Sequence, residues 1–317
     1  SVFGEKAVLR VLERNNLNKN LEEIGLPPSD LKLIRDAISK PDGLILVTGP
    51  TGSGKTTTLY ASLTELNDPS RSLFTAEDPV EGTLKGVTQV QINTTVGLTF
   101  SAVLRSLLRQ DPDVLLVGEI RDKETIEIAI KAALTGHLVL STLHTNDTSA
   151  TIQRLLNMGV EPYLISSAVN LIVAQRLVRK ICEDCKEKAS ISSSILEKFG
   201  VKANELKNIT LYKGAGCKEC GNSGYRGRMP LYEIMVMTER LKELVLKGAS
   251  SMEIKREARL QGMKTLREAG IELLAQGVTT LDEVLSKTNI DSESDESAAS
   301  DGENEPTPEW VAETRVN

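Results

Sequence analysis

Long apolar runs and aromatic side chains are both scarce in this sequence of 317 residues. No stretch approaches the roughly 18 consecutive apolar residues of a membrane-spanning helix. Nor does a basic segment followed by an apolar run open the chain, as it does in secretory signals. Phe, Trp and Tyr make up only 3% of the residues, which argues against a surface that stacks single-stranded bases on aromatic rings. We therefore expect a cytoplasmic protein that binds no nucleic acid.

The negative charge of the chain is concentrated at its C-terminal end. The formal net charge is −6, but residues 291–317 contain nine acidic residues and one basic residue. This stretch carries −8, so the other residues, with 37 bases against 35 acids, carry +2. Few apolar residues and high charge are typical of disorder. We expect a disordered acidic tail over residues 290–317, which is either a solubilising extension or a regulatory arm.

Strand-like and helix-like patterns alternate between residues 41 and 178. Apolar runs stand at 44–47, 72–76, 114–117 and 138–142, and helical patterns cover 55–66, 100–109 and 123–134. Thr99 is a predicted N-cap of the second helix, and residues 86–92 form either a small strand or one arm of a hairpin. Such alternation indicates an α/β fold with a parallel sheet covered on both faces.

The pattern changes after residue 178, and we predict five regions along the chain. The chain opens at Ser1 in a strand-like run, so we expect a fragment of a longer protein in which residues 1–25 end a preceding domain and its linker. The α/β domain covers 26–178, a cysteine-bearing element 179–230, and the tail 290–317. Between the last two, residues 231–289 contain short helical patterns at 251–260, 265–274 and 281–286.

A phosphate-binding loop follows the first predicted strand. Residues 49–56 match G-x-x-x-x-G-K-[ST] between a strand and a helix, and a fortuitous glycine-rich turn is the alternative. Its glycines let backbone N–H groups surround the phosphates of a nucleoside triphosphate at the start of a helix. Lys55 would reach the β- and γ-phosphates, and the Thr56 hydroxyl would coordinate Mg²⁺. The predicted nucleotide-binding residues are Gly49, Pro50, Thr51, Gly52, Ser53, Gly54, Lys55, Thr56 and Thr57.

Carboxylates follow two further strands of the same predicted sheet. Glu119 comes after the strand 114–117, at the carboxyl edge where phosphates bind. Because Gly118 takes the place where an Asp is usual, Glu119 is expected to hold Mg²⁺ through water. Glu77, Asp78 and Glu81 follow the strand 72–76. They form either a solvated turn or a group in which one carboxylate, Glu81 in our interpretation, orients the attacking water.

Both histidines of the chain flank one predicted strand. His144 follows the carboxyl end of the strand 138–142, beside Thr142, Thr145 and Asn146, where a group that senses the γ-phosphate would lie. His137 stands at the opposite end of the strand. A structural role is the alternative for each of them.

All four cysteines occur in two C-x-x-C pairs. Cys182 and Cys185 are separated by 31 residues from Cys217 and Cys220. Disulfides are disfavoured in the cytosol, and two such pairs supply the four thiolates of a closed, structural Zn²⁺ site. A redox dithiol and an apolar role without a ligand remain alternatives. The separation exceeds the usual spacing of about 15–20 residues, which implies an insertion between the pairs.

Together these segments resemble the secretion ATPases of type II secretion and type IV pilus systems over about residues 2–288. The similarity rests on the phosphate-binding loop, Glu77-Asp78-Pro79-Val80-Glu81 (the Asp box), Arg109-Gln110-Asp111-Pro112-Asp113 running into Gly118-Glu119-Ile120-Arg121-Asp122 (Walker B), and residues 136–146 (the His box). The cysteine pairs resemble those of the assembly and secretion members and separate the chain from retraction members. Residues 75–77 and 155–160 look most like the pilus assembly (extension) ATPases.

The resemblance implies a RecA-like P-loop ATPase core with a zinc-binding tetracysteine element and a helical C-terminal part. It implies a homo-hexameric ring that works with an inner-membrane platform protein, peripheral to the cytoplasmic face of that membrane. By motif match, Arg10, Arg105 and Arg109 are candidates to reach a neighbouring subunit's ATP. For Arg105 and Arg109, a solvated helix face is the alternative. A type II secretion ATPase, a DNA translocase and a non-hydrolysing switch are the rival functions.

Overall fold

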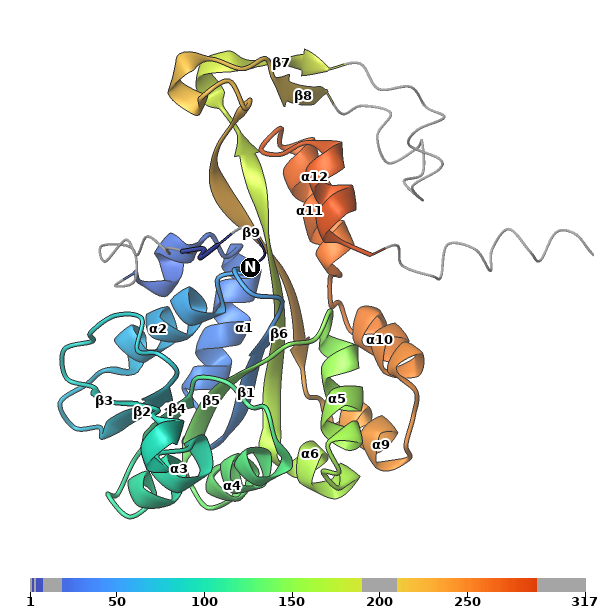
Figure 1. Cartoon of the computed structure of the whole chain (residues 1–317). Helices are drawn as coiled ribbons and strands as arrows, with labels where there is room; N and C mark the ends of the chain where they lie inside the picture. The colour runs from blue at the N-terminus through green and yellow to red at the C-terminus, as the bar shows by residue number, and fades with distance from the viewer. Residues whose placement is uncertain (1, 3, 8–18, 190–209, 290–317) are drawn as a thin grey trace, which may run out of the picture.

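A seven-stranded sheet forms the centre of this computed structural model, which describes residues 2, 4–7, 19–189 and 210–289 (Figure 1). The strand order is β3-β2-β4-β5-β1-β6-β9, and every neighbouring pair is parallel except β6 and β9, which are antiparallel. The strands are β1 (Gly43–Thr48), β2 (Leu73–Glu77), β3 (Thr88–Gln91), β4 (Val114–Val117), β5 (Leu138–Leu143), β6 (Val169–Ile181) and β9 (Tyr225–Val236).

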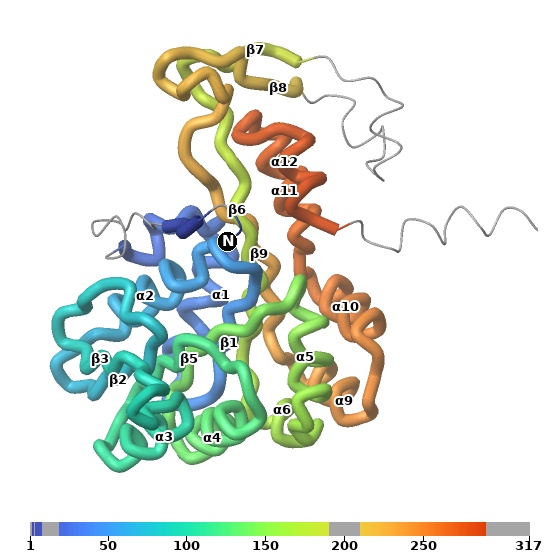
Figure 2. Tube along the Cα trace, viewed as in Figure 1, coloured from blue at the N-terminus to red at the C-terminus, as the bar shows by residue number. Residues whose placement is uncertain are grey.

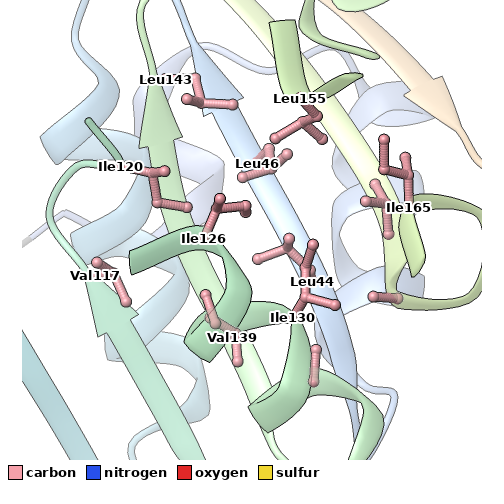
Figure 3. Close-up of a cluster of buried hydrophobic side chains, with 14 of the residues drawn as sticks. Leu44, Leu46, Val117, Ile120, Ile126, Ile130, Val139, Leu143, Leu155 and Ile165 are labelled. Carbon is pink, nitrogen blue, oxygen red and sulfur yellow. The ribbon is translucent and has the colours of Figure 1, made fainter. Parts of the chain in front are cut away.

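Helices cover both faces of this sheet because its strands are apolar on both sides. Leu44 and Leu46 of β1 face one layer, whereas Ile45 and Val47 face the other, as the two-residue period of a strand requires. Figure 3 shows the first layer, in which Leu44 and Leu46 lie near Ile126. Its helices are α3 (Phe100–Leu107), α4 (Lys123–Leu134), α5 (Thr148–Asn157) and α6 (Pro162–Ala168), and the opposite layer contains α1 (Pro28–Ile38) and α2 (Lys55–Leu66).

Most of the predicted elements of the core are confirmed. The helices α2 and α4 have the predicted bounds, and Thr99 caps α3 by accepting a hydrogen bond from the N–H of Ala102. The strand β3 pairs in parallel with β2, so the hairpin alternative for residues 86–92 is wrong. The α/β class and the parallel sheet are confirmed, with one antiparallel edge strand, β9, in addition.

The strands β6 and β9 extend past the covered sheet as a two-stranded ribbon. Figure 1 shows this ribbon leading from the core to a second sheet of β7 (Lys186–Ala189) and β8 (Leu211–Gly214). Both long strands run across the boundaries that the sequence predicts at residues 178 and 230. The apolar pattern of the sequence weakens near residue 178, but the backbone pairing of the two strands continues to Ile181 and Tyr225.

Four short helices form the C-terminal part: α9 (Glu239–Leu246), α10 (Ser251–Leu260), α11 (Leu266–Ala275) and α12 (Leu281–Lys287). The first two pack beside α6 and α5, and the last two lie along the ribbon (Figure 2). Within the described part of the chain, no helix combines the length and apolar character needed to cross a bilayer. The predicted disordered tail lies outside the described residues.

Candidate functional site

A cavity of about 670 Å³ opens at the carboxyl edge of the sheet. The predicted phosphate-binding loop, which connects β1 to α2, lines it with residues 51–57. Carboxylates that follow β2 and β4, and His144 after β5, line it from one side of β1. Segments that are far apart in the sequence thus meet at one edge, as expected for the crevice of an open α/β sheet.

The backbone of the loop explains its glycines. Gly49 has φ +150°, and a Cβ there would lie 2.5 Å from the carbonyl oxygen of Gln175. Gly54 has φ +90° and ends the loop where α2 begins, a conformation that a side chain would strain. Lys55 Nζ donates hydrogen bonds to the carbonyl oxygens of Gly49 (2.8 Å) and Pro50 (3.1 Å). Burial lowers the pKa of Lys55, and the Glu119 carboxylate opposes that shift.

Glu119 lies at the centre of a charged cluster in the cavity. Its side chain is 16% exposed and forms an ion pair with Arg121. The second carboxylate oxygen, Oε2, lies 3.4 Å from His144 Nε2, and Arg121 also lies 3.9 Å from Asp78. The hydrogen bond to Glu119 raises the pKa of Arg121. The structure therefore brings Glu119 and His144 together, 25 residues apart in the sequence.

The three carboxylates of the Asp box differ in their surroundings. Glu77 is buried and accepts hydrogen bonds from Tyr60 (2.5 Å), Thr75 (2.6 Å) and Gln89 (3.0 Å). Burial, together with this carboxylate, raises the pKa of the Tyr60 hydroxyl. Glu81 also lines the cavity, and among the described residues its carboxylate has no ion pair or side-chain hydrogen bond. Glu77 is thus held in a buried network, whereas Glu81 is accessible from the cavity.

Several predicted residues lie outside this cavity. His137 Nδ1 lies 3.0 Å from the carbonyl oxygen of Ala132, at the opposite end of β5. Arg105 forms an exposed ion pair with Glu124 (2.5 Å), and Arg109 donates to the carbonyl oxygen of Arg105. The predicted candidate Arg10 falls outside the described residues. Arg105 and Arg109 therefore line no part of their own chain's nucleotide cavity.

Arg121, Leu177 and Arg228 are among the cavity residues to which the sequence assigns no role. Arg121 stands within the Walker B segment, beside the predicted Glu119. Leu177 on β6 and Arg228 on β9 also line the cavity, but no local motif marks them. The pairing of β6 with β9 brings Arg228 to this cavity.

The segment after β5 is fixed by polar contacts on three sides. Thr48, at the end of β1, accepts a hydrogen bond from the N–H of Thr145 (2.9 Å). Arg176 on β6 donates to the carbonyl oxygen of Asn146 (3.0 Å). Glu233 on β9 accepts hydrogen bonds from the N–H (2.8 Å) and hydroxyl (2.7 Å) of Thr148, at the start of α5. The segment that contains His144 is therefore anchored to three strands.

Glu233 also joins this segment to the C-terminal helices. Its side chain is 1% exposed, and Oε2 accepts a hydrogen bond from the N–H of Leu266 (3.2 Å), the first residue of α11. Burial raises the pKa of Glu233, and the hydrogen bonds from Thr148 oppose the shift. Glu233 could not be predicted from the sequence, because one Glu in an apolar strand carries no motif.

The four cysteines form one cluster at the end of the ribbon. Their Sγ atoms all lie within 4.8 Å of one another, with Cys182 to Cys217 at 3.8 Å and Cys185 to Cys220 at 3.9 Å. Two sulfurs bound at about 2.3 Å in a tetrahedron lie about 3.8 Å apart, so the cluster fits a tetrahedral metal ion. Burial raises the pKa of Cys182 to about 12.

Cys220 is an acidic thiol in this cluster. Desolvation raises its pKa, but hydrogen bonds from the backbone N–H groups of Cys217 and Gly224, together with the neighbouring thiols, outweigh that effect and bring it to about 6. A thiol that ionises readily is a ready metal ligand, since the thiolate is the form that binds. The cluster therefore has both the geometry and the chemistry to hold a metal.

Comparisons with known proteins agree with this site. The profile of the family described as type II/IV secretion system protein matches residues 1–286. The type IV pilus assembly ATPase PilB of Myxococcus xanthus is 50% identical over 92% of this chain and 52% of its own length. Type II secretion system protein E of Pseudomonas aeruginosa is 48% identical over 91% of this chain and 57% of its own length.

The fold also matches a solved structure. The pilus retraction motor PilT with bound ADP superposes with a TM-score of 0.66 at 30% identity, over 90% of this chain and 70% of that one. The predicted RecA-like fold is thereby confirmed. The chain spans about half the length of the two relatives above. Because the family profile matches nearly the whole chain, the protein belongs to the type II/IV secretion system protein family.

Proposed function

We propose that this chain is the ATP-hydrolysing part of a motor that powers type IV pilus assembly. One observation supports this most strongly: a single cavity contains the phosphate-binding loop, the Glu119–His144 pair and Glu81. The 50% identity to PilB of Myxococcus xanthus supports the assignment to pilus assembly.

The predicted site residues in the cavity have roles suited to phosphoryl transfer. Lys55 and the loop N–H groups hold the phosphates, and the Thr56 hydroxyl and Glu119 are placed to hold Mg²⁺, Glu119 through water. When bound, Mg²⁺ neutralises charge on the β- and γ-phosphates. Glu81 orients the attacking water, and His144, near Glu119, senses the γ-phosphate. Positioning and charge neutralisation are most of what such a reaction requires of a protein.

The motor is a homo-hexamer in this proposal. Arg105 and Arg109 are exposed and lie outside their own cavity, and we propose that they, like Arg10, reach the ATP of a neighbouring subunit. The ring acts on an inner-membrane platform protein and is peripheral to the cytoplasmic face of that membrane. Zn²⁺ bound by Cys182, Cys185, Cys217 and Cys220 stabilises the end of the ribbon and has no part in hydrolysis, because four thiolates leave no open position.

A type II secretion ATPase is the second candidate, supported by the 48% identity to type II secretion system protein E. Deletion of the gene separates the two. Loss of pili and of twitching motility supports pilus assembly, whereas loss of protein export with pili intact supports type II secretion.

Phosphate release tests the enzymatic part of the proposal. We expect Lys55→Ala to abolish Mg²⁺-dependent release of phosphate from ATP, because the loop loses its only lysine. Lys131→Ala, an exposed position on α4, is the matched control and should hydrolyse ATP like the unaltered chain. Equal rates for the two variants would exclude this cavity as the site of hydrolysis.

A further inference from the structure

Leu177 and Arg228 line the nucleotide cavity but have no part in the proposed hydrolysis. Leu177 is close to the phosphate-binding loop, since a Cβ on Gly54 would lie 3.8 Å from Leu177 Cδ2. Arg228 is exposed, and across the described residues its guanidinium has no ion pair or side-chain hydrogen bond. Arg121 in the same cavity is paired with Glu119 and Asp78. Arg228 is therefore available to a ligand.

The order of the strands gives the cavity a direction. The groups proposed to act on the γ-phosphate follow β2, β4 and β5, which all lie on one side of β1. The strands β6 and β9, which carry Leu177 and Arg228, lie on the other side. The phosphates bind over the start of α2, directly after β1. Since the base of ATP is at the opposite end of the molecule from its γ-phosphate, the base is directed toward β6 and β9.

The spacing of the two side chains suits a planar base. Leu177 pairs with Pro230, and Arg228 pairs with Arg179, so Leu177 and Arg228 are diagonal neighbours across an antiparallel pair. Such neighbours lie about 7–8 Å apart on one face. Leu177 supplies an apolar surface, and a guanidinium is flat and stacks on aromatic rings while keeping its donors in plane.

We propose that Leu177 and Arg228 form the base-binding end of the nucleotide site, and that Arg228 determines its preference for a purine. This inference rests on the proposed function. It deepens that function by assigning base recognition to β9, a strand outside the predicted α/β domain. A purine presents a larger ring face to the guanidinium than a pyrimidine does, so the contact favours ADP over CDP.

Binding of three probes by calorimetry tests this role: Mg²⁺-ADP, Mg²⁺-CDP and inorganic tripolyphosphate, which has no base. We expect Arg228→Ala to weaken ADP binding by about 2–5-fold, the order of a cation–π contact at an exposed site. It should leave tripolyphosphate binding unchanged and bring the affinities for ADP and CDP closer together. Arg228→Lys keeps the charge without the flat surface and should behave more like the alanine variant than like the unaltered chain. Leu177→Ala should also weaken ADP more than tripolyphosphate.

Arg240→Ala is the matched control, because Arg240 is an exposed arginine on α9 paired with Glu243. It should bind all three probes like the unaltered chain. Unchanged ADP binding by Arg228→Ala would overturn the inference alone. Equal weakening of ADP and tripolyphosphate would also overturn it, by placing Arg228 on the phosphates. If the unaltered chain binds none of the probes, the proposed function fails as well.

Discussion

Replacement of Glu233 by alanine should destabilise the protein strongly. This carboxylate accepts hydrogen bonds from the first N–H groups of α5 and α11, at Thr148 and Leu266. Each buried donor left without a partner costs about 1–3 kcal/mol. The loss is offset in part because the carboxylate is itself expensive to bury. We expect a net loss of about 2–4 kcal/mol in the free energy of unfolding.

Thermal unfolding followed by circular dichroism measures this effect. At about 2–4 °C for each kcal/mol, the midpoint should fall by at least ~4 °C. Glu243→Ala is the matched control, since Glu243 is an exposed glutamate in ion pairs on α9. Exposed pairs contribute little, so its midpoint should change by less than ~2 °C. A fall for Glu233→Ala no larger than for this control would refute the reasoning.

The pH dependence of Glu233→Gln provides a second test. Burial raises the folded-state pKa of Glu233 above its ordinary value of 4.5. Its contribution to stability is therefore present below pH 4.5 and is lost as the pH rises through the raised folded value. Glutamine does not titrate, so the stability deficit of Glu233→Gln should widen as the pH falls from 8 toward 5. A stability deficit that narrows as the pH falls over this range would contradict the inference that burial disfavours the ionised form of Glu233.

Four further predictions concern other parts of the molecule. Cys217→Ser should lower the zinc content, measured by mass spectrometry, from about one ion per chain. An unchanged zinc content would exclude the four cysteines as the zinc site. His144→Ala should slow phosphate release while ADP affinity, measured by calorimetry, changes little; parallel losses would indicate a binding role instead. Arg105→Ala should reduce hydrolysis only at protein concentrations where the chain assembles, so an equal loss in monomers would contradict a role between subunits. In Gly270→Ala, the new Cβ would lie 2.6 Å from Val284 Cγ1. This close contact should lower the free energy of unfolding by about 1–3 kcal/mol. Adding Val284→Ala should partly restore the melting temperature in a thermal melt.

Residues within local motifs were predictable from the sequence because their chemistry and their spacing coincide. The helix after the phosphate-binding loop has the predicted bounds, and Glu119, His144 and the cysteines come together as the order of strands and the paired spacing imply. Each of these signals lies within a few residues of a strand end or a turn.

The remaining features depend on pairing between distant segments. Arg228 reaches the cavity only because β9 returns antiparallel to β6, and no local pattern reveals that partner. Glu233 looks like any polar position of a strand, yet it is buried against the starts of two helices. Glu77, Asp78 and Glu81 stand within five residues of one another, and no local pattern reveals that Tyr60 and Gln89 hold Glu77 in a buried network whereas Asp78 lies near Arg121.

Phosphate release by Glu119→Ala, measured together with its affinity for ATP, tests the central claim most directly. Glu239→Ala, an exposed glutamate on α9, is the matched control and should hydrolyse ATP normally. We predict that Glu119→Ala still binds ATP but releases phosphate at least ~10²-fold more slowly, because the carboxylate acts on the reacting phosphate. Normal phosphate release by Glu119→Ala would contradict the proposal that this cavity hydrolyses ATP.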